Sequence, residues 1–289
     1  MSTASAPVIT TREQAEIDRA NASGRQPVVF VHGLWLLPSS WAAWREFFEE
    51  QGFTTLAPSW PDDPETVAEA RATPSVFAGK SVQGITDHVA TVIGRLDRVP
   101  IVIGHSFGGL IAQKLAGLGL ATATVAVDPG PIKGVLPLPL TTLKVGSAVL
   151  LNPANYRRQV LLTPEQFRFG FGNAVSEAES NDLYARYSVP GSGVPLFQAA
   201  LANFRFGGET AADTKNPARG PLLVISGEKD HTVPWAVANA TYKLQKKNPG
   251  TTEIVEMAGR GHSLTIDSGW REVAETALRF VRAQVNVAS

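Results

Sequence analysis

A serine flanked by glycines stands where two apolar segments of the chain meet. Residues 104–108 read Gly-His-Ser-Phe-Gly, directly after the apolar run 100–103 and before the amphipathic segment 108–118. A buried strand that enters such a serine and leaves as a helix is the G-x-S-x-G nucleophile elbow. The tight turn strains the backbone of the serine, and glycines two positions away on either side avoid a steric clash. The positive N-terminus of the following helix points at the serine hydroxyl. The spacing therefore predicts a nucleophilic serine at Ser106.

A serine hydroxyl needs a base to remove its proton and a third group to orient that base. In an open parallel sheet, such groups meet at the carboxyl ends of the strands. We therefore expect an acid and a histidine after later strands, in the order serine, acid, histidine. Asp230 follows the apolar run 222–225, and His262 lies in the glycine-rich loop after residues 253–257. Both residues have the predicted placement.

Strands and helices that could position these residues alternate along most of the chain. Apolar runs predict six strands, over residues 28–31, 53–57, 101–103, 122–127, 222–225 and 253–257. Apolar periodicity and capping residues predict six helices. The first runs over about 11–22, with Thr11 as its cap and Gln14 in the capping box, and the second is capped by Ser39 or Ser40 and ends at Gly52. The others run over about 82–98, 108–118, 234–247 and 267–285. Short connections between alternating strands and helices predict an α/β fold with a doubly wound, mostly parallel sheet.

The alternation stops after the fourth strand. Residues 129–216 contain no clear strand and eight prolines. An insertion of this length is rarely bare loop, so we expect a helical lid. The predicted organisation is an N-terminal lead and short helix over 1–26, an α/β core over 27–132 and 217–289, and the lid over 133–216.

The ordered set of motifs resembles the α/β-hydrolase superfamily. The resemblance rests on His32-Gly33, the elbow at 104–108, the acid loop 227–234 and Gly261-His262, and it covers residues 27 to about 285. It implies Ser106 as nucleophile, His262 as base and Asp230 as the orienting acid. Only 26 residues precede the first clear strand, so we expect the two leading strands of the family to be absent or reduced.

Other residues compete for two of these roles. Asp128 ends the strand after the elbow helix, where some family members carry their acid. We favour Asp230 because Gly-x-x-Asp-x-x-Val-Pro matches the family's usual acid loop. His32 resembles the family's turn-stabilising histidine, His88 is interpreted as a surface or core residue, and His105 as a packing neighbour of the site.

The resemblance also implies an oxyanion hole, which needs two preorganised donors. We expect the backbone N–H groups of Leu34 and Phe107 to supply them, and Trp35 and Trp60 to border a substrate pocket. Apolar lid side chains could line the same pocket: Leu136, Leu138, Leu140, Leu143, Phe167, Phe169, Phe171, Phe197, Phe204 and Phe206.

Composition excludes several other classes. The 289 residues carry 26 basic and 26 acidic side chains, so no net charge favours nucleic acid or an anionic membrane. The absence of cysteine excludes disulfides and thiolate chemistry. Scattered histidines give no metal-ligand spacing, and neither a signal peptide nor a membrane span is visible. We expect a cytoplasmic protein without metal or cofactor, as monomer or homodimer.

The function predicted from the sequence is a serine hydrolase that cleaves carboxylic esters of small to medium hydrophobic substrates through an acyl-enzyme. The same three residues could serve a perhydrolase or a carbon–carbon bond hydrolase, which the sequence does not separate. A ligand-binding receptor on the same fold is the alternative without enzymatic activity.

Overall fold

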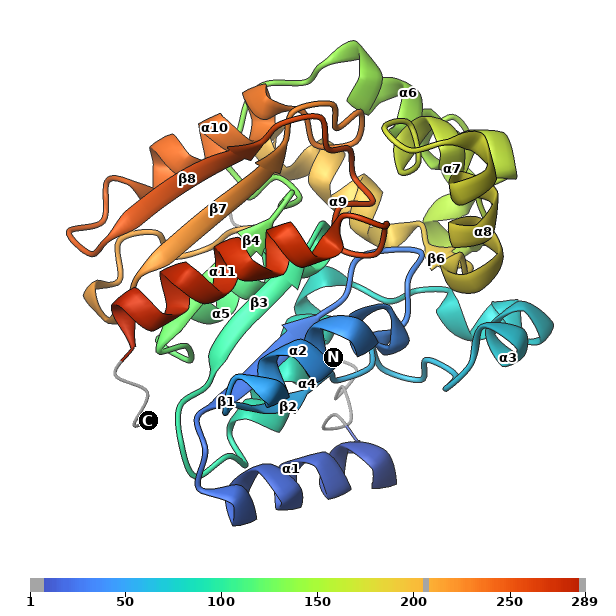
Figure 1. The fold of residues 1–289 in the computed structure, drawn as a ribbon. Helices are drawn as coiled ribbons and strands as arrows, with labels where there is room; N and C mark the ends of the chain where they lie inside the picture. The colour runs from blue at the N-terminus through green and yellow to red at the C-terminus, as the bar shows by residue number, and fades with distance from the viewer. Residues whose placement is uncertain (1–7, 205–207, 286–289) are drawn as a thin grey trace, which may run out of the picture.

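The computed structural model describes residues 8–204 and 208–285. Its main sheet has six parallel strands in the order β2-β1-β3-β4-β7-β8 (Figure 1). Their bounds are Pro27–Val31 (β1), Thr54–Leu56 (β2), Ile101–His105 (β3), Ala123–Val127 (β4), Leu222–Gly227 (β7) and Thr252–Met257 (β8). The predicted fold class is confirmed.

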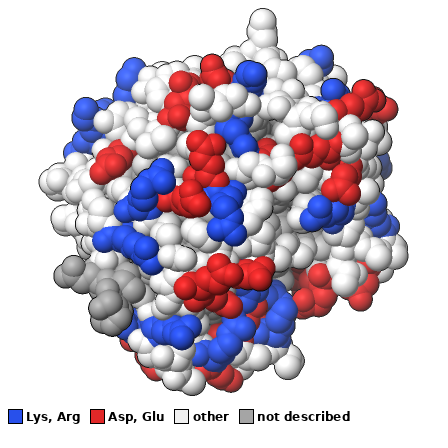
Figure 2. Space-filling model, viewed as in Figure 1, with Lys and Arg blue, Asp and Glu red and all other residues white. Residues whose placement is uncertain are grey.

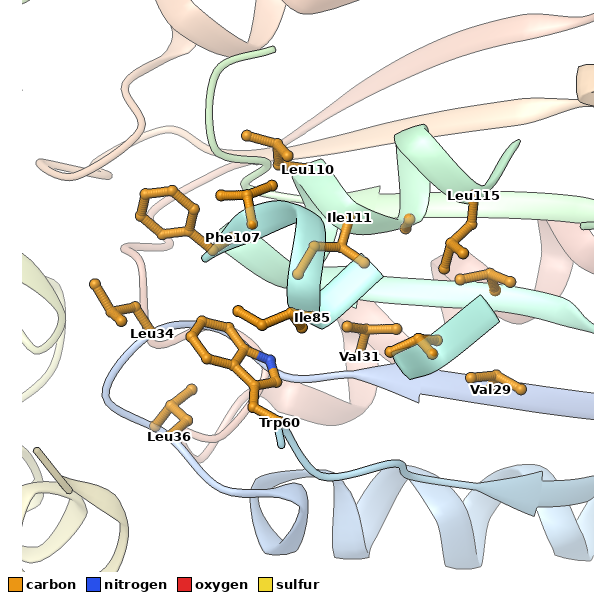
Figure 3. Close-up of a cluster of buried hydrophobic side chains, with 14 of the residues drawn as sticks. Val29, Val31, Leu34, Leu36, Trp60, Ile85, Phe107, Leu110, Ile111 and Leu115 are labelled. Atoms are coloured by element: carbon orange, nitrogen blue, oxygen red, sulfur yellow. The ribbon is translucent and has the colours of Figure 1, made fainter. Parts of the chain in front are cut away.

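Helices cover both faces of the sheet. Its core helices are α1 (Thr11–Ser23), α2 (Ala42–Glu50), α3 (Val67–Ala72), α4 (Val82–Ile93), α5 (Phe107–Gly117), α10 (Trp235–Gln245) and α11 (Trp270–Gln284). Alternate side chains of a strand point to opposite faces. In β1, Val28 and Phe30 accordingly pack with α2 and α11, whereas Val29 and Val31 join the cluster that contains α4 and α5 (Figure 3). Each face of the sheet is buried under its own helical layer.

The lid lies between β4 and β7 in the chain and gathers at one end of the sheet (Figure 1). It consists of α6 (Leu140–Leu150), α7 (Pro164–Gly170), α8 (Glu177–Tyr187) and α9 (Val194–Leu201), with a two-stranded antiparallel ladder of β5 (Gln159–Val160) and β6 (Gly191–Ser192). The sequence showed no strand here because each of these strands has two residues. The exact domain boundaries stay a prediction.

The strand order reverses direction next to β1. Strand β2 lies on one side of β1 and β3 on the other, so the connections leaving β1 and β3 diverge. In such sheets ligands bind in the crevice at this switch point, beyond the carboxyl ends of the strands. The loop after β1 carries Gly33 and Leu34, and the turn after β3 carries Ser106. The topology therefore brings the predicted oxyanion loop next to the predicted nucleophile.

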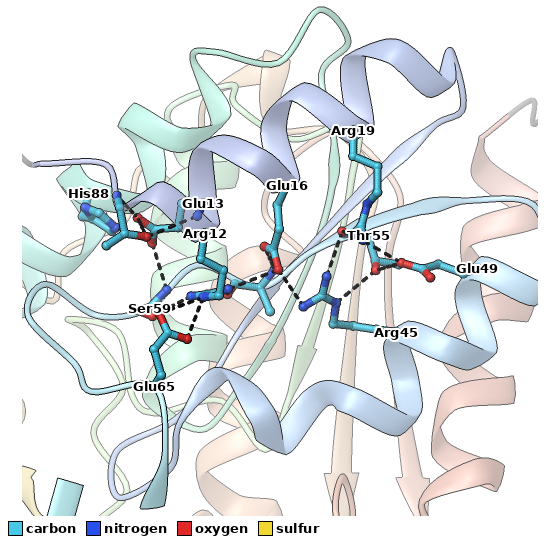
Figure 4. A network of polar contacts seen from close by, with 12 residues as sticks. Arg12, Glu13, Glu16, Arg19, Arg45, Glu49, Thr55, Ser59, Glu65 and His88 are labelled. Atoms are coloured by element: carbon cyan, nitrogen blue, oxygen red, sulfur yellow. Dashed lines mark hydrogen bonds and ion pairs between the residues drawn. The ribbon is translucent and has the colours of Figure 1, made fainter. Parts of the chain in front are cut away.

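Helix α1 precedes β1, and no strand precedes β1 within the described ranges. This helix docks on the chain that follows β2 through a buried polar network (Figure 4). Glu13 accepts hydrogen bonds from the Ser59 N–H at 3.1 Å and from His88 Nε2 at 2.8 Å, and Glu16 accepts from the Ala57 N–H at 3.1 Å. The helix thereby satisfies backbone groups that follow the edge strand of the sheet.

Two local expectations were wrong. Thr10, not Thr11, caps α1, and its capping-box partner is Glu13, not Gln14. Two adjacent threonines offer the same chemistry, and burial of Glu13 favours the observed register. The segment between β2 and α4, for which no helix was predicted, contains α3, which begins with a capping box of Thr66 and Glu69.

Among the described residues, no helix is both long and apolar enough to cross a lipid bilayer. On the face shown in Figure 2, basic and acidic side chains are interspersed.

Replacing Glu13 by Gln is expected to destabilise the protein in a pH-dependent way. Burial acts to raise the pKa of Glu13, but hydrogen bonds from His88 and Thr10 and the charge of His88 outweigh it, so the pKa lies below the ordinary value of 4.5. A carboxyl group whose pKa is lowered by folding stabilises the folded state when the pH is above the ordinary pKa. This stabilisation is lost as the pH falls below that value. Glu13→Gln should cost about 1–3 kcal/mol at pH 7.

Urea unfolding at several pH values measures this difference. The difference in the free energy of unfolding between wild type and Glu13→Gln should narrow as the pH falls below 4.5. Glu65→Gln is the control, because Glu65 pairs with Arg12 at an exposed position and should cost less than about 1 kcal/mol. A difference in the free energy of unfolding that stays constant across this pH range would contradict the lowered pKa of Glu13.

Candidate active site

The turn that carries Ser106 has the strained geometry of the predicted elbow. Ser106 has φ 56°, a left-handed value that costs energy for any residue with a Cβ atom. A Cβ on Gly104 would lie 2.1 Å from the Gly108 carbonyl oxygen, and one on Gly108 would lie 2.0 Å from the Val31 carbonyl oxygen. Only glycine fits at these two positions, so the turn can form only with this spacing.

The three side chains predicted from strand order lie in one line of hydrogen bonds. His262 Nδ1 lies 2.6 Å from Asp230 Oδ2, and His262 Nε2 lies 3.0 Å from Ser106 Oγ. A carboxylate can only accept, so Nδ1 carries the proton and the bare Nε2 accepts from the serine hydroxyl. His262 is fully buried and Ser106 nearly so. This arrangement can remove the serine proton and stabilise the imidazolium that forms.

Asp230 is held in place by hydrogen bonds from its own loop. Its Oδ1 accepts from the N–H groups of Thr232 at 2.6 Å and Val233 at 2.9 Å, while Oδ2 accepts from His262. Asp128 ends β4 close by, with its Oδ2 3.9 Å from His262 Nδ1, beyond hydrogen-bond distance. Of the two acids that the sequence offered, Asp230 is the one bonded to the histidine.

His105 packs against the His262 ring and bonds to its backbone. Its ring lies 4.7 Å from the His262 ring, and its Nε2 donates to the His262 carbonyl oxygen at 2.9 Å. Burial and then the nearby charge of His262 hold the pKa of His105 well below its ordinary value, although the hydrogen bond opposes this. A neutral His105 therefore fixes the backbone of the histidine loop. The sequence indicated packing here but gave no sign of this bond.

The loop after β1 approaches Ser106 closely because it contains glycine. A Cβ on Gly33 would lie 2.9 Å from the Ser106 Cβ. His32 Nδ1 donates to the Gly33 carbonyl oxygen at 3.0 Å. The Gly33 carbonyl and the Leu34 N–H belong to one trans peptide unit and point in opposite directions. The bond from His32 therefore fixes the direction of the Leu34 N–H.

A buried ion pair stands behind this loop. His32 Nε2 lies 3.5 Å from Asp63 Oδ2, Asp63 forms an ion pair with Lys80, and Trp60 stacks on the His32 ring at 5.1 Å. Trp60 lies in the buried cluster of Figure 3, which also holds Leu34 and Phe107. The sequence did not reveal the pairing of Asp63 with Lys80, because both residues are charged and lie outside the predicted strands and helices.

Trp35 borders the site from the lid side. It has φ 67°, is nearly fully buried, and donates from Nε1 to the Val160 carbonyl oxygen at 3.0 Å. Its ring meets Phe171 edge-on at 6.2 Å, and Phe171 in turn meets the His262 ring at 4.8 Å. Trp35 and Phe171 thus form an aromatic wall beside His262.

The lid is hydrogen-bonded to both loops that carry the acid and the histidine. His231 Nδ1 donates to the Phe169 carbonyl oxygen at 2.9 Å, Thr232 Oγ1 donates to the Gly170 carbonyl oxygen at 2.8 Å, and Asn173 Nδ2 donates to the Lys229 carbonyl oxygen at 2.7 Å. The Ser263 N–H donates to the Phe171 carbonyl oxygen at 3.2 Å. Residues 169–173 are therefore part of the wall of the site.

The apolar lid residues divide into two groups. Phe167 and Phe171 are buried, and Phe169 and Phe197 are half-buried. Five others point to solvent: Leu136, Leu138, Leu140, Leu143 and Phe204. For these five, the expectation of a pocket wall was wrong, because apolar character alone does not tell which side of a lid a residue faces. Phe206 lies outside the described residues.

One group of buried side chains has the composition of a metal site. Nitrogen and oxygen atoms of His105, Asp128 and His262 lie within 4.8 Å of one another. Both ring nitrogens of His262 already have partners, Ser106 and Asp230, and His105 Nε2 bonds a carbonyl oxygen. We therefore interpret this group as side chains packed around a histidine whose ring nitrogens are both engaged.

The class of protein is shown by comparison with known families. A sequence profile of the alpha/beta hydrolase family matches residues 28–276. The chain belongs to this family.

Solved structures similar to the chain share its fold at low sequence identity. A monoacylglycerol lipase from Paleococcus ferrophilus is 18% identical, with a TM-score of 0.60 over 90% of this chain and 95% of that chain. A pyrethroid hydrolase from Sphingobium faniae JZ-2 is 19% identical, with a TM-score of 0.59 over 89% and 98%. A thioesterase domain from the curacin biosynthetic pathway is 16% identical, with a TM-score of 0.55 over 89% and 92%. No curated protein sequence matches closely enough to be a relative.

Proposed function

We propose that the protein is a serine hydrolase that cleaves carboxylic esters of small to medium hydrophobic substrates. The observation that carries the proposal is the continuous line of hydrogen bonds from Ser106 through His262 to Asp230. In this mechanism His262 takes the Ser106 proton as Oγ attacks the ester carbonyl, and then protonates the leaving alcohol. A water molecule, activated by the same histidine, releases the acid from the acyl-enzyme.

The negative charge that forms on the carbonyl oxygen needs donors that are already in place. The proposed donors are the N–H groups of Phe107, at the first turn of α5, and of Leu34, whose direction the His32 bond fixes. The positive end of α5 adds to the stabilisation of this charge.

The proposed ester class has support from the surroundings of Ser106. The aromatic pair of Trp35 and Phe171 suits an apolar acyl or aryl group. The similar structures include a lipase, a pyrethroid hydrolase and a thioesterase. Those names describe the other proteins, and they agree with a nucleophilic serine used on acyl compounds.

A fluorophosphonate probe is expected to label wild-type protein at Ser106. Ser106→Ala should abolish the labelling and lower kcat on p-nitrophenyl acetate by roughly 10⁴- to 10⁶-fold, because no other hydroxyl is bonded to His262 among the described residues. Mass spectrometry of the labelled peptide and initial rates measure both effects. The exposed Ser75→Ala variant is the control.

Folded wild-type protein that takes up no probe would favour the ligand-binding alternative. Labelling without ester turnover would instead direct the next assays to peroxide with carboxylic acids and to cleavable diketones.

Among p-nitrophenyl esters from acetate to decanoate, kcat/KM should be highest for a short or medium chain. The lid is bonded to the acid and histidine loops, and its leucines at 136–143 face solvent instead of extending an apolar channel. Steady-state rates across the series measure the preference. Highest activity on decanoate would contradict it.

Gly33→Ala should slow turnover by about 100- to 1,000-fold, the effect of losing one oxyanion donor. The added methyl group would meet the Ser106 Cβ at 2.9 Å and the His105 carbonyl oxygen at 3.1 Å, so the loop with Leu34 must move away. Measured kcat and thermal unfolding separate this effect from loss of fold. The control is the exposed Gly84→Ala in α4, where an added Cβ meets only Ser81 Oγ, at an ordinary contact distance of 3.4 Å. Unchanged kcat in Gly33→Ala would remove Leu34 from the proposed oxyanion hole.

A further inference from the structure

A second buried acid lies beside the line of Ser106, His262 and Asp230. Asp128 ends β4, is fully buried, and has φ 39° in the left-handed region. Its Oδ1 accepts from the Gly227 N–H at 2.7 Å. Its Oδ2 is buried and receives no hydrogen bond from the described residues. A strained backbone and an oxygen without a donor both carry a cost, so this acid calls for an explanation.

The two acids differ in how many donors they receive. Asp230 accepts three N–H bonds, from Thr232, Val233 and His262, whereas Asp128 accepts one, from Gly227. Two ionised carboxylates in contact inside a protein repel strongly, and they avoid this by retaining one proton. The proton belongs on the acid with fewer donors, which is Asp128. An O–H on Asp128 Oδ2 also gives that oxygen a partner.

The other groups around Asp128 are consistent with this assignment. The titratable side chains facing it are His105 from β3, Asp230 from the loop after β7, and His262 and Asp267 from the loop after β8. Burial, followed by the charge of Asp230, raises the pKa of Asp128 well above its ordinary value, although the Gly227 bond opposes this. Asp267 is itself engaged by Arg260 and by Ser263 Oγ.

We propose that Asp128 is a positioning residue that keeps its proton at neutral pH and donates it in a hydrogen bond to the carboxylate of Asp230. The inference rests on the proposed function, because its consequence is for the histidine that activates Ser106. The bond holds the Asp230 carboxylate in addition to the N–H groups of its own loop. It also leaves one negative charge beside His262 in place of two. A second charge 3.9 Å from Nδ1 would hold the imidazolium proton more tightly and hinder its transfer to the leaving alcohol.

The protonated acid can be observed without any substrate. The infrared difference spectrum between wild type and Asp128→Asn at neutral pH should contain the carbonyl stretch of a protonated carboxylic acid. The matched control is Asp97→Asn at an exposed position, which should give a difference from an ionised carboxylate only. A difference spectrum for Asp128→Asn that shows only carboxylate bands would overturn the proposal.

Stability gives a second readout that needs no substrate. Because native Asp128 retains a proton that the unfolded chain releases above the ordinary value of 3.8, wild-type stability should fall with rising pH relative to Asp128→Asn. Urea unfolding of both proteins at several pH values above 3.8 measures the difference in their free energies of unfolding. A stability difference that does not change with pH would mean that Asp128 is ionised in the folded protein, and would overturn the proposal.

Activity separates positioning from the competing roles. Asn tolerates the left-handed backbone, can accept from Gly227 and can donate to Asp230, so Asp128→Asn should keep kcat/KM within about fivefold. Asp128→Ala removes the donor and should lower kcat by about 10- to 100-fold with little change in KM. Asp230→Asn should lower kcat by about 10⁴-fold.

Two activity outcomes would overturn the proposal. Equal losses in Asp128→Asn and Asp128→Ala would give Asp128 no role as a donor. A loss in Asp128→Asn as large as in Asp230→Asn would make Asp128 an ionised partner of His262. Absence of ester turnover in wild type would contradict the proposed function instead, and the infrared and stability measurements would still test Asp128.

Discussion

The structure depends on the close approach of three backbone segments at the carboxyl ends of β1 and β3. Glycines at 33, 104 and 108 make this approach possible, since a Cβ at any of them would lie 2.0–2.9 Å from a neighbouring atom. The backbone of the turn between Gly104 and Gly108 cannot relax, and Ser106 is therefore kept at φ 56°. The strain holds the hydroxyl beside His262 before any substrate binds, so the cost of ordering the nucleophile is met during folding.

Most of the fold and the central residues of the site could be predicted because their signals are local. Each of the six strands lies in a short, largely apolar run, although β8 at the sheet edge is only partly buried, and the boundaries agree with prediction within a few residues. The rule that functional groups follow parallel strands then selects Asp230 and His262 from residues far apart in the chain. The resemblance to the alpha/beta hydrolase family supplied their roles. Local pattern and topology together therefore suffice to place three side chains.

The remaining features of the site depend on contacts that no local pattern encodes. The pair of Asp63 and Lys80, the bond from His105 to the His262 carbonyl, and the contact of Asp128 with Asp230 each join residues from separate elements. In the sequence, a charged residue that will be buried cannot be distinguished from one that will be exposed. The cap of α1 at Thr10 was missed for a related reason, since burial of Glu13, a tertiary effect, decides between two threonines.

The bonds between the lid and the core restrict how the site can open. Residues 169–173 are bonded to the loop of Asp230 through Lys229, His231 and Thr232, and to the loop of His262 through Ser263. Separating this segment from the core would break four hydrogen bonds and displace the two loops that hold Ser106 ready. A lid movement that preserves the arrangement must therefore leave the end of α7 in place. The neighbouring lid helices are tied to the core as well: Thr142 Oγ1 of α6 donates to the Thr232 carbonyl oxygen, and Gln198 Oε1 of α9 accepts from the Val82 N–H.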